Sequence, residues 1–152
     1  MFQFSFTKRV WIALISLFLF SYLFSLINYV PENKQLDDVY YFSLSELFSF
    51  TIVYAAPVYL LGGITVSYLI DWFLKKKLFN KPMLVSAGLY SISGFVLIVF
   101  YIFVIVGDKE VVWNPKAFLY VGLIGIGAAL TFFFISLLFY YFGKKFSKDK
   151  TE

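Results

Sequence analysis

The stretch DWFLKKKLFNKP, which runs from Asp71 to Pro82, decides the fold predicted for this chain. It is the densest cluster of charged residues between two long apolar runs, residues 47–70 and residues 83–106. Basic residues beside an apolar span set which side of a membrane the adjoining loop occupies. The stretch is therefore predicted to be a loop that divides the chain into two hydrophobic hairpins.

The composition of the chain places it in a membrane. Its 152 residues are 61% hydrophobic and 24% aromatic with only 14% charged, which lies outside the usual balance of a soluble domain. A soluble protein of this length could not cover so much apolar surface, so lipid must solvate the excess. A spanning helix needs about 20 apolar residues, which leaves room for one domain of a few helices. We therefore predict a single all-α transmembrane domain over residues 1–152.

Four apolar runs are long enough to span a bilayer as helices. They are continuously apolar, whereas the strands of a membrane β-barrel alternate between apolar and polar residues. Ser43 and Glu46 have the spacing of a capping box, which predicts the start of the second helix. Gly143, followed by Lys144 and Lys145, predicts the end of the fourth. In chain order, the predicted spans are residues 10–30, 47–70, 83–106 and 117–142, with outer loops 31–46 and 107–116, cytoplasmic loop 71–82 and a cytoplasmic tail at residues 143–152.

The distribution of charge predicts the orientation of these spans. Ten of the 13 Lys and Arg residues fall on the side that holds the N-terminus, loop 71–82 and the C-terminal tail, and six of the nine acidic residues fall on the other. The positive-inside rule therefore predicts an up-down four-helix bundle with both termini in the cytoplasm of a multi-pass cell-membrane protein. The residues predicted to determine this topology are Lys8, Arg9, Lys75, Lys76, Lys77, Lys81, Lys144 and Lys145.

The partner that these cations predict is the lipid bilayer. They stand at the ends of apolar runs and not along one face, so we expect anionic lipid headgroups on the cytoplasmic side, and no nucleic acid. A protein partner that docks on residues 75–77 is the alternative. The two hairpins repeat one order of basic flank, span, acidic loop and span. A duplicated unit would give this order, and so would the positive-inside rule acting alone.

Small residues at helical spacing mark the predicted contacts between helices. Because lipid tails are as apolar as Leu, helices in a membrane associate through close backbone approach and hydroxyl hydrogen bonds. Ordinary packing within the chain and a homodimer through the Gly122 face both use such residues. The predicted helix-packing residues are Gly122, Gly125 and Ala129 of the fourth span, Ala87, Ser91 and Gly94 of the third, and Gly63 of the second.

Pro57 lies near the middle of the second span, where it removes one backbone donor and predicts a kink. Gly62 and Gly63 follow within two turns. This span is therefore predicted to be the least regular of the four, with Pro57 as a hinge or as part of a cavity wall. The alternative is an ordinary proline whose freed carbonyl is satisfied by neighbouring groups.

Several classes of function are disfavoured by what the spans lack. The chain has no His and no Cys, which removes the usual metal ligands, general bases and thiolate nucleophiles. The predicted spans also contain no Asp, Glu, Lys or Arg at membrane depth, which weighs against a pump or a proton antiporter. Oxygen ligands from the outer acids could bind a divalent cation, although loop charge explains those acids better. We expect no enzymatic activity, no cofactor, no metal and no catalytic residue.

With four spans, the Lys75-Lys-Lys77 and Lys81-Pro82 turn, and helices rich in Phe, Tyr and Ile, the chain resembles the small uncharacterised four-helix membrane proteins of low-GC Gram-positive bacteria. The resemblance implies a cell-membrane protein of unassigned activity and carries no site residues. The function we expect is helix–helix interaction, as an accessory, regulatory or immunity-type subunit beside a larger membrane protein or a second copy. The alternative is an oligomeric channel or transporter for a neutral solute or lipid.

Overall fold

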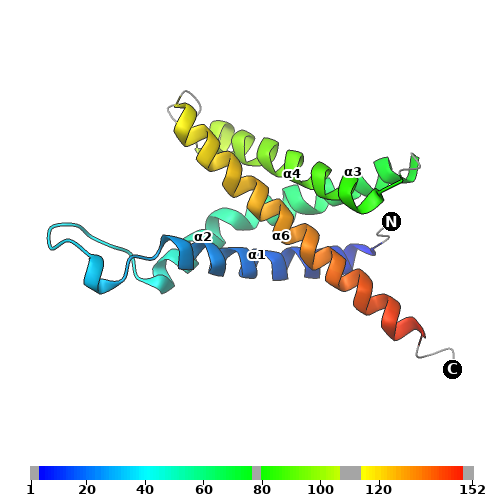
Figure 1. Ribbon diagram of the computed structural model, residues 1–152, viewed down its shortest axis with the longest axis horizontal. Helices are drawn as coiled ribbons and strands as arrows, with labels where there is room; N and C mark the ends of the chain where they lie inside the picture. Colours follow the sequence, from blue (N-terminus) through cyan, green and yellow to red (C-terminus); the bar gives the residue numbers. More distant parts are fainter. Residues whose placement is uncertain (1–3, 77–79, 107–113, 149–152) are drawn as a thin grey trace.

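The computed structural model describes residues 4–76, 80–106 and 114–148 (Figure 1). Four of its helical segments are long and apolar enough to cross a membrane: Phe6–Asn28, Leu44–Lys76, Pro82–Val104 and Pro115–Lys144. The part of the chain described contains helices and turns and no strand. The predicted all-α fold of four packed spans is confirmed.

The segment between the first and second spans is bounded by an extended residue at one end and a capping box at the other. Helix α1, Phe6–Asn28, stops at the extended residue Tyr29, and a short 3₁₀ turn, η1, covers Glu32–Lys34. Helix α2, Leu44–Pro57, starts at the predicted capping box, which is confirmed. The Ser43 amide donates to Glu46 Oε2 at 2.8 Å, and the Glu46 amide donates to Ser43 Oγ at 3.3 Å. Both otherwise unpaired amides are thereby satisfied.

The second span is irregular immediately after Pro57, as predicted. Helix α2 ends at Pro57, a π-helical segment η2 covers Val58–Gly63, and helix α3 continues over Ile64–Lys76. Proline lacks the amide that an α-helix needs at this point, and a local π-helical adjustment is one way in which a membrane helix accommodates it. Whether Pro57 acts as a hinge stays a prediction.

The remaining spans are helix α4, Pro82–Tyr101, its π-helical extension η3, Ile102–Val106, and helix α6, Pro115–Lys148. Helix α6 passes through Gly143, which was predicted to end it, so that prediction is wrong. A helix-ending glycine adopts the left-handed conformation, and Gly143 does not.

A second correction concerns residues 71–76, which were assigned to cytoplasmic loop 71–82. Helix α3 continues through them to Lys76. The reason is that Asp71 is buried against α1, where it has an ionic partner, so the helix does not end at the last apolar residue.

The four spans form two pairs that cross. Helix α4 packs mainly on α6, and α1 packs on both α2 and α6. Figure 1 shows α6 crossing α1, while the α1–α2 pair diverges from the α4–α6 pair toward the left of the view. We call the right-hand end, where α1 begins and α3 ends, the basic end. The left-hand end, which carries residues 29–43, is the acidic end. Which of them faces the cytoplasm stays a prediction from charge.

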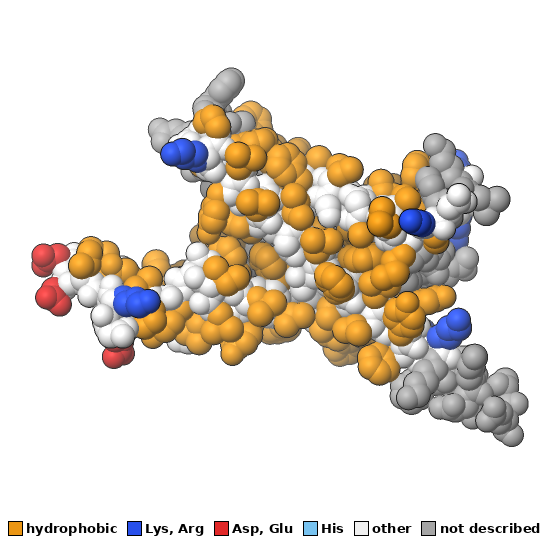
Figure 2. Space-filling model, in the orientation of Figure 1, with side chains coloured by type: hydrophobic (Ala, Val, Ile, Leu, Met, Phe, Trp, Pro, Cys, Tyr) orange, Lys and Arg blue, Asp and Glu red, His pale blue; other side chains and the backbone are white. Residues whose placement is uncertain are grey.

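The core lies toward the basic end. Its buried hydrophobic side chains include Ile12 and Leu17 of α1, Leu74 of α3 and Phe132 of α6, with Tyr59 at mid-span. By contrast, α2 has no buried residue. Outside the core, hydrophobic side chains cover the length of the spans, and acidic side chains gather at the left tip (Figure 2). Lipid therefore contacts most of the surface.

Candidate functional site

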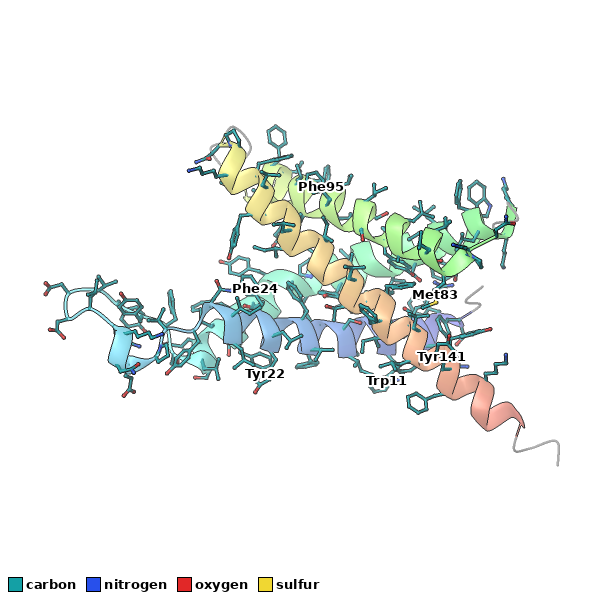
Figure 3. All side chains as sticks on the ribbon, viewed as in Figure 1. Trp11, Tyr22, Phe24, Met83, Phe95 and Tyr141 are labelled. Carbon is teal, nitrogen blue, oxygen red and sulfur yellow. The ribbon has the colours of Figure 1, made fainter. Side chains whose placement is uncertain are left out.

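A cavity of about 530 Å³ lies where the two helix pairs diverge, and we call it the chamber. All four spans contribute to its wall. Phe24 stands on the side of α1 that faces α4 and α6, whereas Tyr22 stands on the opposite side (Figure 3). The other principal lining residues are Phe20 of α1, Phe50, Thr51 and Tyr54 of α2, Tyr59 and Gly63 of η2, Ser93, Gly94, Leu97 and Ile98 of α4, and Ile124, Gly125, Ala128 and Phe132 of α6.

One wall of the chamber is the close contact between α4 and α6. A Cβ atom added to Gly94 would collide with the carbonyl oxygen of Gly125 and with the Ala129 methyl group, and one added to Gly125 would collide with Ile98. Gly122 is covered in the same way by the ring of Phe95. Only glycine lets the two backbones approach so closely. Three of the residues selected by sequence spacing, Gly94, Gly125 and Ala129, therefore meet at one contact.

The opposite wall is tied to α6 at mid-span. Tyr59 is only 3% exposed, and its hydroxyl donates to the Ala128 carbonyl oxygen at 2.8 Å. A buried hydroxyl needs such a partner where water is absent. Gly63, one turn later, lets the Phe132 ring pack against the backbone of η2, since an added Cβ would lie 3.2 Å from that ring. The irregular segment after Pro57 therefore forms the floor of the chamber.

The chamber is lined by apolar and hydroxyl-bearing side chains. Its polar side chains are hydroxyls of Thr51, Ser93 and tyrosines, and Thr51 already donates to the Leu47 carbonyl oxygen at 2.7 Å. Among the described residues that line it there is no Asp, Glu, Lys or Arg. A cavity of this volume and lining is suited to an uncharged, mainly hydrocarbon ligand and is unsuited to an ion.

A buried ion pair joins α1 to α3 at the basic end. Arg9 is 3% exposed and Asp71 is 6% exposed, and Arg9 Nη2 lies 2.5 Å from Asp71 Oδ2. Arg9 Nη1 donates to the Ser67 hydroxyl, and the guanidinium lies 4.0 Å above the centre of the Tyr68 ring. A planar guanidinium can make all these contacts at once, which an ammonium group cannot.

This ion pair is the main feature that the sequence analysis missed. Arg9 was predicted only as a topology determinant and Asp71 only as a loop residue. Two signals were available. Arg9 is the one arginine among 13 cations, and Ser67 stands four residues before Asp71, on the same helical face.

The other predicted site residues are more dispersed. Ala87 is packed against the core, and the Ser91 hydroxyl donates to the Ala87 carbonyl oxygen of its own helix at 2.9 Å. Pro57 is exposed. The predicted topology cations Lys8, Lys75, Lys76, Lys81 and Lys144 are exposed, and Lys76 Nζ lies 3.8 Å above the Trp72 ring. Lys77 and the Lys145 side chain lie outside the described part of the chain.

The outer acids do not assemble a metal centre in the part of the structure described. Asp108 and Glu110 fall outside the described residues. Among the residues that are described, no three His, Cys, Asp or Glu side chains stand close enough together to hold a metal ion.

The sequence matches no protein-family model, and no similar curated protein or solved structure was found. The four long apolar helices support the resemblance drawn from the sequence only as far as a small four-helix membrane protein. No homologue identifies a family. These helices show a small polytopic membrane protein, in contact with the lipid bilayer.

Proposed function

We propose that this protein is a non-enzymatic lipid-binding membrane protein that holds a hydrocarbon chain in the chamber. The observation that carries the proposal is the chamber itself, an apolar cavity of about 530 Å³ lined by all four spans, with no charged side chain among the described lining residues. The proposal shares its lipid ligand with the second hypothesis drawn from the sequence, an oligomeric channel or transporter for a neutral solute or lipid, but it concerns binding and not transport. The interaction role that the sequence placed first stays a prediction, tested by crosslinking partners in native membranes.

A hydrocarbon chain is the occupant that the surroundings supply. The chamber opens within the apolar part of the spans, where acyl chains are the solvent and an apolar hollow stays free of water. An unfilled hollow forfeits the dispersion contacts of every atom that lines it. Filling it with a chain restores those contacts, so occupancy is favourable without any polar anchor.

Selectivity for one chain over another must come from shape. A chain that enters the chamber leaves lipid and not water, so the hydrophobic effect contributes little to its binding. What distinguishes the chamber from bulk lipid is its rigid wall, made of the rings of Phe20, Phe24 and Tyr59 on one side and of the Gly94–Gly125 contact on the other. We expect the protein to discriminate by chain length, branching and unsaturation.

The α2 wall is the side through which a chain would enter. None of the residues of α2 is fully buried, and the helix packs on α1 and on η2. Segments with few buried contacts open at the lowest free energy, and a π-helical turn at their base is a natural place for the bend. Entry beside α2 therefore requires no break in the better-packed α4–α6 pair.

The experiment uses a phospholipid with a photoreactive diazirine in its acyl chain. Protein reconstituted in bilayers that contain this probe is irradiated, and the labelled residues are mapped by mass spectrometry. Two variants form a matched pair on α6. Ala128→Phe places a ring in the chamber wall, whereas Gly127→Phe places the same ring on the exposed side, where an added Cβ meets no atom within 4 Å.

We expect labelling of chamber residues in the wild type and in Gly127→Phe, and its loss in Ala128→Phe. Ser93→Phe, which fills the chamber from α4, should repeat the loss and guard against a local effect at residue 128. Uniform labelling of the lipid-facing surface, unchanged by both chamber variants, would overturn the proposal.

A further inference from the structure

A second cavity, of about 480 Å³, lies at the basic end beside the ion pair, and we call it the basic-end cavity. It is lined by Ser5 and Arg9 from the start of α1 and by Tyr68, Trp72 and Lys75 from the end of α3, among others. The geometry points to a binding site for the phosphate group of an anionic phospholipid from the leaflet at this end. This inference does not depend on the chamber, which has a different lining.

The first observation is a buried donor without an acceptor. The Arg9 side chain is 4% exposed, and its two terminal nitrogens bond to Asp71 and Ser67, but within the described part of the chain Nε has no hydrogen-bond partner. Buried N–H groups are nearly always satisfied, and the residue that carries this unsatisfied one, Arg9, lines the cavity. A phosphate oxygen is an acceptor that suits a guanidinium.

The second observation is the start of α1 in the same wall. Ser5, the N-cap residue, makes no side-chain capping bond, and the first turn of the helix contains no acidic residue. The free amides of a first turn carry partial positive charge and bind anions. Ser5 and Arg9, which flank this first turn, both line the cavity.

The charge of the cavity also favours an anion. Among the described lining residues there are two cations, Arg9 and Lys75, and one carboxylate, Asp71, so this part of the lining carries one net positive charge. A phosphodiester carries one negative charge and would balance it. Lys75 is exposed and stands at the rim, where a flexible ammonium group can follow a headgroup oxygen.

The phosphate is assigned to a lipid because of the surface around the cavity. Trp72, in its wall, is 57% exposed, and Phe6 and Trp11 of the adjoining α1 are 63% and 57% exposed. Exposed tryptophans at the end of a spanning helix mark the level of the headgroups. Acyl chains attached to a phosphate held here would lie along this apolar surface, which a free phosphate ion could not use.

The test compares two neighbouring lysines. Lys75→Gln removes a cation that lines the basic-end cavity, and Lys76→Gln removes the same charge from a residue that does not line it. Each full-length variant is reconstituted in nanodiscs of phosphatidylcholine with a minor fraction of phosphatidylglycerol. Retained lipid is counted by native mass spectrometry after release into detergent.

We expect one phosphatidylglycerol to be retained selectively by the wild type and by Lys76→Gln, and retention to fall about fivefold in Lys75→Gln, the loss that corresponds to one lysine near a membrane surface. Arg9→Lys, which keeps the charge but removes Nε, should also lose selective retention. Equal losses in Lys75→Gln and Lys76→Gln would show diffuse surface attraction and overturn the site. Displacement of phosphatidylglycerol by millimolar inorganic phosphate would overturn its assignment to a lipid.

Discussion

The two ends of the bundle are held together in different ways. At the basic end, α1 and α3 are joined by the Arg9–Asp71 ion pair and by the hydrogen bond to Ser67, and most of the buried hydrophobic side chains lie in this half. Toward the acidic end the helix pairs diverge around the chamber, and α2 buries none of its residues. Spans pack closely where buried polar groups of one helix need partners on another. They can stay apart where their facing surfaces are apolar, because lipid can then take the place of a neighbouring helix.

The buried serines sharpen this comparison. Ser16, Ser25, Ser86 and Ser136 are at most 2% exposed, and each hydroxyl donates to the carbonyl oxygen four residues earlier in its own helix. These serines let helices approach because they are small. Specific polar links between helices come from Arg9 and Tyr59, and at the acidic end the exposed Tyr120 hydroxyl donates to Asn28 Oδ1 at 3.4 Å.

The largest predicted effect comes from breaking the ion pair. Asp71→Ala leaves the buried Arg9 guanidinium without its anion, and stranding one partner of a buried pair costs about 3 kcal/mol of the free energy of unfolding. Unfolding in mixed micelles with increasing SDS measures this loss. Asp37→Ala, at an exposed loop position, is the matched control and should leave the unfolding curve unchanged.

The double variant Arg9→Met with Asp71→Leu separates the pair from the packing around it. Replacing both charges by apolar side chains of similar volume is often neutral, so the double variant should recover most of the stability lost in Asp71→Ala. A double variant as unstable as the single one would mean that the ion pair contributes more than charge compensation.

A smaller effect is expected where α4 meets α6. Gly125→Leu forces a side chain into the contact with Gly94 and Ile98, and overpacking of this kind costs about 2 kcal/mol. Gly127→Leu makes the same change on the exposed side of α6, where no atom lies within 4 Å of an added Cβ, and should not lower stability. Equal behaviour of the two variants in SDS unfolding would contradict the contact.

Much of the fold could be predicted from the sequence because it depends on local patterns. Apolar length gave the four spans, Ser43 and Glu46 gave the start of α2, and Pro57 gave the irregular segment. Spacing also selected Gly94 and Gly125, which the structure brings together. Each depends on residues close in the chain, or on one helical face.

The features that sequence reasoning missed depend on how helices are placed relative to one another. The Arg9–Asp71 pair joins residues 62 positions apart, and no pattern in either segment states which faces meet. The chamber depends on the angle between two helix pairs, which small changes in packing alter. The π-helical segment at Ile102–Val106 contains no proline from which it could have been predicted. Gly143 is a glycine, as is typical after the end of a helix, but it does not adopt the left-handed conformation that ends one.

A third stability prediction concerns the Tyr59 hydroxyl, which lies at mid-span between the basic end and the acidic end. Tyr59→Phe removes its hydrogen bond to the Ala128 carbonyl oxygen and keeps the ring, so we expect a loss of about 1 kcal/mol in SDS unfolding. Tyr54→Phe removes the hydroxyl of an exposed ring in the chamber wall and should have no measurable effect. A Tyr59→Phe variant as stable as the wild type would show that ring packing alone fixes the floor of the chamber.

The smallest effect concerns the acidic end, where polar contacts are exposed. The Tyr40 hydroxyl donates to Glu46 Oε1 at 3.0 Å, and this hydrogen bond raises the pKa of Tyr40 above its usual 10.0. Only the protonated phenol donates, so any stabilisation of the α2 start is complete below pH 10 and is lost as pH rises through the raised pKa. A ¹³C-tyrosine titration should show the Tyr40 pKa falling toward 10.0 in Glu46→Gln. The stability of the basic end should be the same in both proteins. A Tyr40 pKa that is the same in Glu46→Gln as in the wild type would show that residues 29–43 are not held against the capping box through Tyr40. The acidic end would then have one polar contact fewer, and its difference from the basic end would be larger.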